Sequence, residues 1–308
     1  MSDVTDLAGA TAGPAPCAAA RPLKAVQQFM LASVLRSEGD AARVLERVRA
    51  VGYDAIELNA FMTSGTPLVV RALTRLAGMP VGRGGSFDWP RLLLGACLVA
   101  SAYHVDLGSL ERDAGAVVEA AHALGTSELV ITALYRFDYA DAGAVRSLAR
   151  RLDAAGRAVA ERGSRLSYHN HNAEFLRVEG ERSAYDLLLD ETDPGLVSFE
   201  LDTYWAAEAG MDTVRLMRRV AAGGRLSAWH VSDRRPQVPR RGMLTPMLTS
   251  DACELGHGCL PLDTLMGEAL AGGVRSVVLE THRNWTGGSP VRSLEESAHF
   301  LNERIGGA

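Results

Sequence analysis

Residues 40–59 read DAARVLERVRAVGYDAIELN and hold a helical pattern followed at once by a strand pattern. Apolar residues recur at helical spacing from Asp40 to Ala50, and Gly52 stands where a helix commonly ends. The apolar run Tyr53–Leu58 comes next and is typical of a buried strand. The stretch therefore predicts a helix that leads directly into a strand, which is the repeating unit of a parallel sheet covered by helices.

The same alternation continues along most of the 308 residues. Further helices are expected at 111–124, 142–161 and 261–271, each closed by a glycine before the next strand. Eight strands are expected, at 25–32, 53–58, 97–104, 128–134, 165–170, 196–201, 226–231 and 276–280. Eight such units favour an α/β fold, a single closed (β/α)8 TIM barrel, over an open doubly wound sheet. No GxGxxG follows the first strand, which weakens the dinucleotide-binding alternative.

The ends and the longer connections of the chain carry less periodicity. Residues 1–23 are rich in Ala, Gly, Pro and Thr and are expected to form a disordered tail, with the barrel at 24–308. Two longer loops are expected, at 79–91 before the third strand and at 232–259 after the seventh. The second emerges at the C-terminal face of the barrel, where active sites lie, whereas the first is expected to be structural or an interface.

Composition limits the location and the partners. The acidic N-terminus does not resemble a signal peptide and the four cysteines form no CxxC pair, so a reducing cytoplasm is expected. The net charge of −5 argues against nucleic acid, and no apolar run is long enough for a membrane span. Lys24 is the only lysine, which argues against Schiff-base catalysis. The expected partner is a small molecule, and a homo-oligomer is left open.

Polar side chains end the last four predicted strands. Glu174 follows the fifth strand, and Asp202, His230 and Glu280 stand at the ends of the next three. In a TIM barrel these ends meet at one rim, so the four side chains are expected to lie close together. One imidazole and three carboxylates suit Mn²⁺, Co²⁺, Mg²⁺ or Zn²⁺. Their occurrence at successive strands favours a metal site over four unrelated solvated side chains.

Other residues are expected around the same rim. The predicted substrate-binding residues are Glu57, His104, His169, Trp205 and His257. His169 and His171 are two positions apart, so both point to one side of their strand. Packing in the barrel mouth is an equally good interpretation for Glu57, His104 and Trp205, and an exposed loop position is the alternative for His257.

Five strings resemble the sugar phosphate isomerase/epimerase family of xylose isomerase-like barrels. They are YHNHNAEF (168–175), FELDTYWAAEAG (199–210), WHVSDR (229–234), ELGHG (254–258) and VVLETH (277–282). Inosose dehydratases and ketose 3-epimerases are relatives, and the resemblance covers roughly residues 25–305. It implies a divalent metal, Mn²⁺ first among the candidates, held by Glu174, Asp202, His230 and Glu280. His169 is the alternative to Glu174 as the ligand from strand five.

Three positions depart from the pattern of that family. Ser232 stands where relatives usually carry the lysine of HxKD, and His257 replaces the glutamate of a GEG turn. Thr281 and His282 follow Glu280 in place of the usual acidic residue or glutamine pattern. Because these changes lie around the substrate, they leave the substrate and the reaction outcome open.

The predicted site suits proton abstraction next to a carbonyl. The expected catalytic residues are Glu174, Glu280 and His171, with the two carboxylates exchanging protons on opposite faces of a small sugar or cyclitol. That chemistry gives isomerisation or epimerisation. With a leaving group β to the carbanion, the same site would be a lyase or dehydratase acting on a keto-sugar, a keto-inositol or a 3-keto-glycoside. A DNA-repair endonuclease is disfavoured by the negative charge, and a barrel that binds a ligand without turnover stays open.

Overall fold

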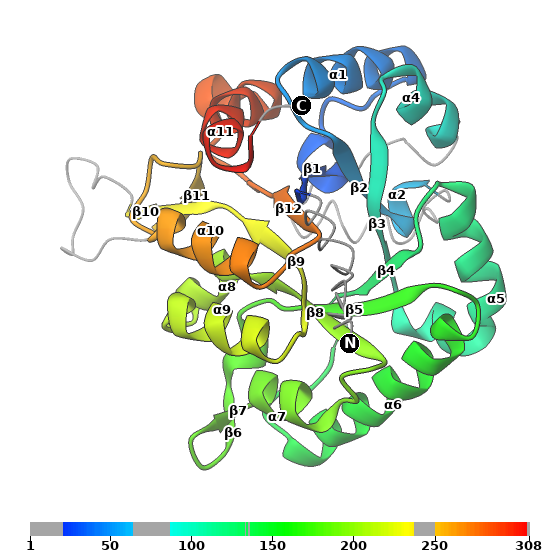
Figure 1. Cartoon of the computed structure of the whole chain (residues 1–308), viewed down its shortest axis with the longest axis vertical. Helices are drawn as coiled ribbons and strands as arrows, with labels where there is room; N and C mark the ends of the chain where they lie inside the picture. Colours follow the sequence, from blue (N-terminus) through cyan, green and yellow to red (C-terminus); the bar gives the residue numbers. More distant parts are fainter. Residues whose placement is uncertain (1–20, 64–86, 133, 135, 237–249, 307–308) are drawn as a thin grey trace, which may run out of the picture.

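The computed structural model describes residues 21–63, 87–132, 134, 136–236 and 250–306. Eight parallel strands among them close into a barrel, in the order β1-β12-β9-β8-β5-β4-β3-β2 (Figure 1). The barrel strands are β1 (Leu23–Gln27), β2 (Ala55–Asn59), β3 (Val99–Val105), β4 (Glu128–Ile131), β5 (Arg165–His169), β8 (Val197–Asp202), β9 (Leu226–Val231) and β12 (Ser276–Leu279). The predicted (β/α)8 TIM barrel is therefore confirmed.

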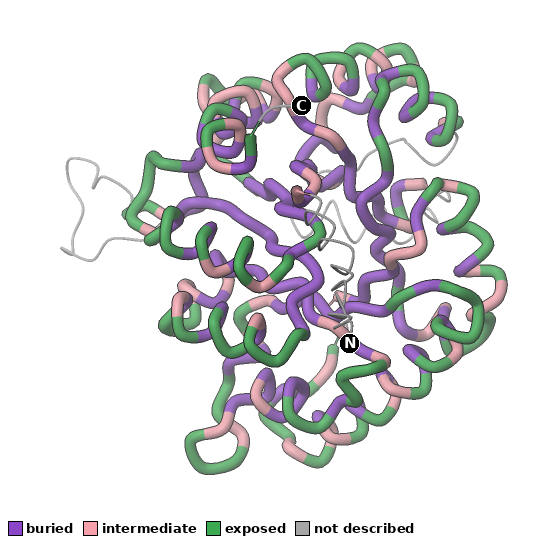
Figure 2. Tube along the Cα trace, in the orientation of Figure 1, coloured by how far each residue is buried: buried purple, intermediate pink, exposed green. Residues whose placement is uncertain are grey.

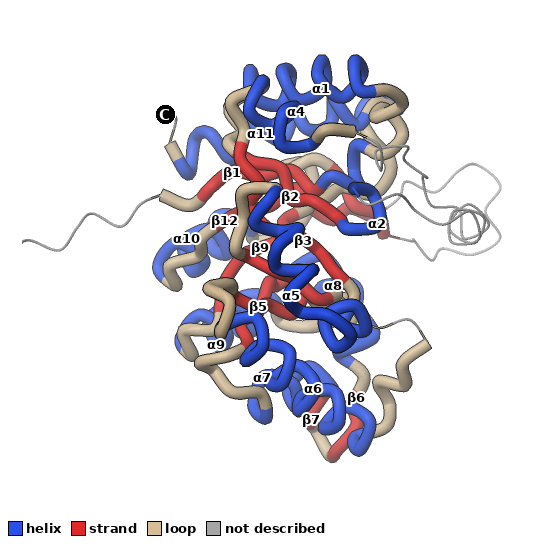
Figure 3. The backbone as a smooth tube through the Cα atoms, turned by 90° about the vertical axis from the view of Figure 1, so that its right-hand side faces the viewer, coloured by secondary structure: helices blue, strands red, loops and turns tan. Residues whose placement is uncertain are grey.

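Helices surround the barrel on its outside in both views of the backbone (Figures 1 and 3). They are α1 (Glu38–Ala50), α2 (Ala60–Thr63), α4 (Trp89–Gly95), α5 (Leu107–Ala123), α6 (Ala142–Ala160), α7 (Ala184–Glu191), α8 (Thr203–Glu208), α9 (Thr213–Ala222), α10 (Leu262–Ala271) and α11 (Pro290–Ile305). Short 3-10 helices lie at η1 (Gln28–Leu31), η3 (Ala173–Phe175) and η4 (Thr286–Gly288). Figure 2 shows the strands largely buried and the outer faces of the helices exposed.

Helix α6 shows how the sequence builds one of these covering elements. Asp141 caps its start by accepting hydrogen bonds from the N–H groups of Gly143 and Ala144. Its apolar residues recur at helical spacing and are buried against the barrel. A Cβ at Gly156 would lie only 2.6 Å from the carbonyl oxygen of Leu196, so glycine permits this close packing.

The first barrel strand, β1, contacts the last helix, α11, at the N-terminal side of the barrel. Lys24, on β1, is only 2% exposed. Its Nζ donates hydrogen bonds to Oδ1 of Asn302, at 2.6 Å, and to the carbonyl oxygen of Gly306, at 3.2 Å. The first barrel strand is thereby fastened to the end of α11.

The interior of the barrel is packed differently at its two ends. Small residues fill the N-terminal half, where Ser167 Oγ donates to Ser227 Oγ and Ser227 Oγ donates to the Phe199 carbonyl, both at 2.8 Å. A cavity of about 150 Å³ lies there, and Ser101 and Ser276 also line it. The C-terminal half is filled by charged and imidazole side chains, described below.

Differences from the predicted elements are local. The first strand runs from Leu23 to Gln27 instead of 25–32, because Gln28–Leu31 turn into η1 and the Gln27 side chain accepts the N–H of Phe29. The start of β1 also shortens the predicted tail, whose residues 1–20 lie outside the described part of the chain. The first predicted loop falls mostly outside it too, and its last residues begin α4.

The second predicted loop contains an antiparallel pair, β10 (Asp233–Pro236) with β11 (Ser250–Cys253), while residues 237–249 lie outside the description. A second small pair joins β6 (Arg177–Glu179) to β7 (Arg182–Ser183). Cys97, Cys253 and Cys259 are free thiols. No helix within the described residues has the length and apolar character needed to span a membrane.

Candidate active site and metal centre

Four buried side chains meet at the C-terminal end of the barrel, and we call them the outer group. They are His169 of β5, Asp202 of β8, His230 of β9 and Glu280 directly after β12. One possible ligand atom from each lies within 4.8 Å of the corresponding atoms of the others. Two imidazoles and two carboxylates are a donor set that suits divalent ions such as Mn²⁺, Zn²⁺ or Co²⁺. The residues present therefore fit a metal.

Asp202 is held in place by its neighbours on both sides. The side chain of Asn170 donates to the Asp202 carbonyl and accepts the Asp202 N–H, each at 3.0 Å. One carboxylate oxygen of Asp202 accepts the N–H of Trp205 at 2.9 Å and so caps α8. These bonds fix the backbone and one oxygen of Asp202 at the barrel end.

Glu174 is placed apart from this group. In η3, its Oε1 accepts the hydroxyl of Tyr168 at 2.9 Å and its Oε2 accepts the N–H of His171 at 3.0 Å. The side chain is buried, and burial raises the pKa of its carboxyl. Both oxygens are thus already bonded within the protein. Of the two candidates expected at strand five, the structure brings His169 to the outer group and not Glu174.

A second set of side chains lies against His230, and we call Glu57, His104 and Glu200 the inner group. The Nε2 of His230 lies 2.5 Å from Glu57 Oε2 and 2.9 Å from Glu200 Oε1. The Nε2 of His104 lies 2.9 Å and 3.1 Å from the same two oxygens. On the other side of its ring, His230 Nδ1 lies 2.9 Å from Glu280 Oε2. His230 therefore faces the inner group with one nitrogen and the outer group with the other.

Electrostatics couple the inner group tightly. Burial alone would lower the pKa of His104, but Glu57 and Glu200 raise it to about 10. For Glu200 burial opposes ionisation, yet His230 and His104 hold its pKa well below the ordinary value. The carboxylates of the inner group therefore stabilise the protonated rings, and a His230 ring that keeps its Nε2 proton presents Nδ1 to the outer group.

Aromatic and imidazole rings line the mouth beside the outer group. His171 lies 5.0 Å from His169 and 5.7 Å from Trp205 between ring centroids, and Trp205 lies 5.7 Å from His282. His171 Nδ1, Trp205 Nε1 and His282 Nε2 are buried and have no hydrogen-bond partner among the described residues. Burial lowers the pKa of His171 to about 3, so its ring is neutral near pH 7.

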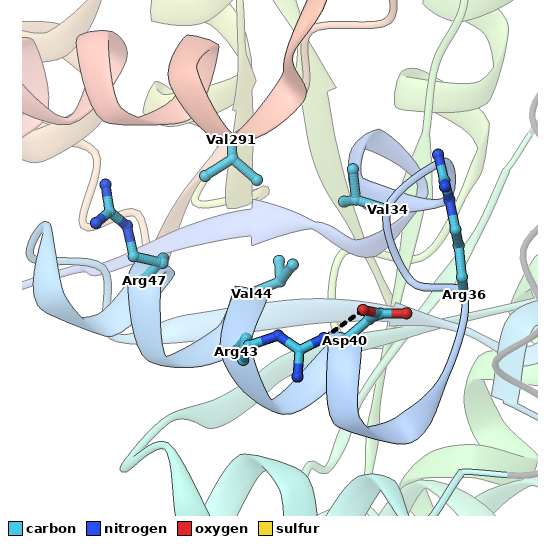
Figure 4. A pocket seen from close by; sticks show the side chains of 7 residues that line it. All are labelled: Val34, Arg36, Asp40, Arg43, Val44, Arg47 and Val291. Carbon is cyan, nitrogen blue, oxygen red and sulfur yellow. Dashed lines mark hydrogen bonds and ion pairs between the residues drawn. The ribbon is translucent and has the colours of Figure 1, made fainter.

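His257 is exposed in its loop, which was the alternative interpretation for this residue. It lines a pocket against α11 together with Glu296 and His299. Its possible ligand atom groups with those of Glu254 and Glu296, and no contact found within the described residues joins it to the outer group. A further surface pocket, lined by Val44, Arg43 and Asp40 among others, lies beside α1 and contains no candidate site residue (Figure 4).

Two residues of the site were not predicted from the sequence. Glu200 is two positions before Asp202, so both point into the barrel. The same spacing was applied to His169 and His171, and it would also have identified Glu200. His282 was noted only as a departure from the family pattern, yet its Nδ1 lies 3.9 Å from Glu280 Oε1. Glu57 and His104, for which substrate contact and packing were equally good interpretations, lie against His230.

A closed parallel barrel with buried imidazoles and carboxylates at the C-terminal ends of its strands defines a TIM-barrel protein with a candidate metal centre. The family model described as xylose isomerase-like TIM barrel matches residues 45–304. The chain belongs to this family, as the resemblance of its motifs implied.

Solved structures show the same fold. A sugar phosphate isomerase/epimerase from Parabacteroides distasonis has a TM-score of 0.69 at 22% identity, over 92% of this chain and 94% of that chain. A probable 3-DHS dehydratase from Bacillus anthracis has a TM-score of 0.64 at 13% identity, over 92% and 99%. The IolI protein with a bound zinc atom has a TM-score of 0.62 at 13% identity, over 92% and 98%. Comparison with curated protein sequences gives no significant match.

Proposed function

We propose that this protein is a divalent-metal-dependent isomerase or epimerase of a small sugar or cyclitol. The observation that carries the proposal is the outer group, a buried set of metal-ligating side chains at the mouth of a barrel of this family. We assign His169, Asp202, His230 and Glu280 as ligands, so that Glu174 gives way to His169. Mn²⁺ is the ion we propose first, with Co²⁺, Mg²⁺ and Zn²⁺ as alternatives, and zinc in the related IolI structure supports a divalent ion.

When bound, the ion would supply Lewis-acid polarisation of a carbonyl and its neighbouring hydroxyl, which stabilises negative charge after proton removal. His171 is the proposed proton acceptor, because its Nδ1 is unpartnered within the described structure and its ring lies 5.0 Å from that of His169 in the outer group. Glu174 accepts the N–H of His171 and so positions it.

Epimerisation also needs a group that returns a proton from the opposite face. We assign this role to Glu280, which reaches the site from a different strand than His171 and must first take up a proton, because His282 and His230 lower the pKa of its carboxyl. Trp205 and His282 form a wall of the mouth where a sugar ring can stack and hydrogen-bond.

A lyase acting on a keto-sugar, keto-inositol or 3-keto-glycoside is the second candidate. The structural similarity to a probable dehydratase favours it, since elimination begins with the same proton abstraction. Its additional requirement is an acid for the leaving oxygen. We assign this role to His282, whose Nδ1 lies 3.9 Å from Glu280 Oε1, and not to His257, which lies against α11.

The test is to incubate the Mn²⁺-loaded protein in D₂O with ketoses, keto-inositols and 3-keto-glycosides and to follow each by NMR. Deuterium at a retained carbon with a changed configuration or carbonyl position supports the isomerase or epimerase. An unsaturated product supports the lyase. The Asp202→Ala variant is the control and should be inactive. Absence of deuterium uptake and of product across all three substrate classes would contradict both candidates.

A further inference from the structure

A second cluster of metal-ligating side chains lies outside the barrel, between the segment after β11 and helix α11. Glu254, His257 and Glu296 each offer an atom within 4.8 Å of the others. Glu254 is buried, His257 is exposed and Glu296 is half-buried, so the cluster spans the boundary between interior and solvent. None of the three belongs to the outer or the inner group.

Hydrogen bonds hold these side chains in position. Thr286 bridges the two carboxylates, because its N–H donates to Glu254 Oε1 and its hydroxyl donates to Glu296 Oε2, both at 2.9 Å. The N–H of His257 donates to the Glu254 carbonyl at 3.1 Å, and the N–H of Leu255 donates to Ser297 Oγ on α11 at 3.2 Å. The loop is therefore fixed on the helix before any ligand binds, and the Thr286 bonds occupy one oxygen of each carboxylate.

The charge of the cluster is not balanced locally. Glu254 is only 1% exposed, and its Oε1 accepts the N–H of Thr286. In the described part of the chain, neither Glu254 nor Glu296 has an ion-pair partner. Arg304 lies nearby but pairs with Asp263 at 2.5 Å and Glu303 at 3.1 Å. Two neighbouring carboxylates without an ion-pair partner in the described structure, one of them buried, are a favourable place for a cation.

The cluster is accessible from outside. A pocket of about 310 Å³ opens at His257 and Glu296, and the imidazole of His299, one turn along α11 from Glu296, lines it as well. An ion can reach His257 and Glu296 through this pocket, which Glu303 and Arg304 also line, and Glu254 lies buried behind them. A nearby second imidazole adds a further nitrogen donor to the wall of the pocket.

We propose that Glu254, His257 and Glu296 form a second divalent-metal site, selective for Zn²⁺ over Mg²⁺, that fastens the loop after β11 to α11. An imidazole with two carboxylates is a zinc-type donor set, whereas Mg²⁺ prefers oxygen ligands and water. The site is independent of the proposed function, because it uses none of the outer-group residues.

The experiment is a zinc titration of untagged, metal-free protein, with bound zinc counted by mass spectrometry of the native chain. It is done on the wild type, on Asp202→Ala to remove the outer site, and on Asp202→Ala combined with His257→Gln. His122→Gln, an exposed histidine on another helix, is the matched control in the same Asp202→Ala background. Thermal melting with and without Zn²⁺ gives a second readout.

We expect one bound zinc in Asp202→Ala and in its His122→Gln derivative, and none in its His257→Gln derivative. Zinc at a hundredfold excess over Kd should raise the Tm of Asp202→Ala by about 5 °C. It should leave the Tm of the His257→Gln derivative unchanged. No zinc in Asp202→Ala, or equal zinc after His257→Gln, would overturn the proposal. The count for Asp202→Ala does not depend on whether the outer group binds metal in the wild type, so the two proposals fail separately.

Discussion

The outer and the inner group meet at His230, which belongs to the first and contacts the second, but they differ in what surrounds them. In the outer group His169, Asp202 and Glu280 converge at the barrel mouth, next to rings with unpartnered polar atoms. In the inner group Glu57 and Glu200 each contact both His104 and His230, so the charges are compensated within the protein. The comparison indicates that the same residue types can serve two tasks. Side chains that converge beside unpartnered polar atoms can bind an ion. Side chains that are already paired with one another can hold a metal-binding residue in its orientation.

The largest effect is expected for Asp202→Ala. Removing a carboxylate from the outer group should reduce metal affinity by at least about 1,000-fold, while the fold persists because the group lies at the barrel rim. Metal content after equilibrium dialysis measures the loss, and circular dichroism checks the fold. Full metal content in Asp202→Ala would remove the outer group as a metal centre.

A pair of substitutions separates the two residues expected at strand five. His169→Asn should lower metal affinity by about 100-fold, whereas Glu174→Gln should leave it within about threefold, since both Glu174 oxygens are bonded within the protein. Glu174→Gln should instead slow turnover by loosening His171. Dialysis and inductively coupled plasma analysis give the metal content of both variants. The reverse pattern would restore Glu174 as the ligand.

Glu57→Gln tests whether the inner group acts through His230. The amide keeps the shape but weakens the hold on His230 Nε2, so we expect metal affinity to fall by about 10- to 100-fold. Glu128→Gln, a carboxylate near the opposite end of the barrel, is the control and should bind as the wild type does. An unchanged Kd in Glu57→Gln, measured by calorimetry, would show that the inner group serves only packing.

The smallest effect comes from pH. Burial raises the pKa of Asp202 to about 7 in the metal-free protein, although His230 opposes the shift. Below pH 7 the carboxyl is therefore protonated and must lose its proton when metal binds. Affinity should fall more steeply below pH 7, by up to about a further tenfold for each pH unit. Calorimetry in two buffers of different ionisation enthalpy should detect more protons released at pH 6 than at pH 8, and equal release at both would contradict this assignment.

The fold was predictable because the strand–helix period repeats along the chain. All eight barrel strands were found, and the glycines at 52, 125, 163 and 273 adopt the positive φ expected at helix ends. The predicted end of the first strand was wrong, because Gln28–Leu31 are as apolar as a strand. They form η1 instead, where the Gln27 side chain accepts the N–H of Phe29.

The site was predictable in part. Strand ends identified Asp202, His230 and Glu280 as neighbours, because parallel strands end at one rim. Sequence could not decide between His169 and Glu174, since the bonds from Tyr168 and His171 that occupy Glu174 depend on the turn of η3. For His257 the sequence left substrate contact and an exposed loop position open, because loop length says which face a segment leaves but not which helix it then contacts.

Lys24 gives the protein an unusual chemical property. It is the only lysine of the chain, and its ammonium group is buried between β1 and the end of α11. Burial also lowers the pKa of Lys24, but a bulky reagent cannot reach its ammonium group while β1 and the end of α11 stay in contact. Amine-directed labelling of the Lys24 side chain would therefore report the separation of β1 from the end of α11. The labelling rate, followed by mass spectrometry, would measure how often the first strand and the last helix separate under native conditions.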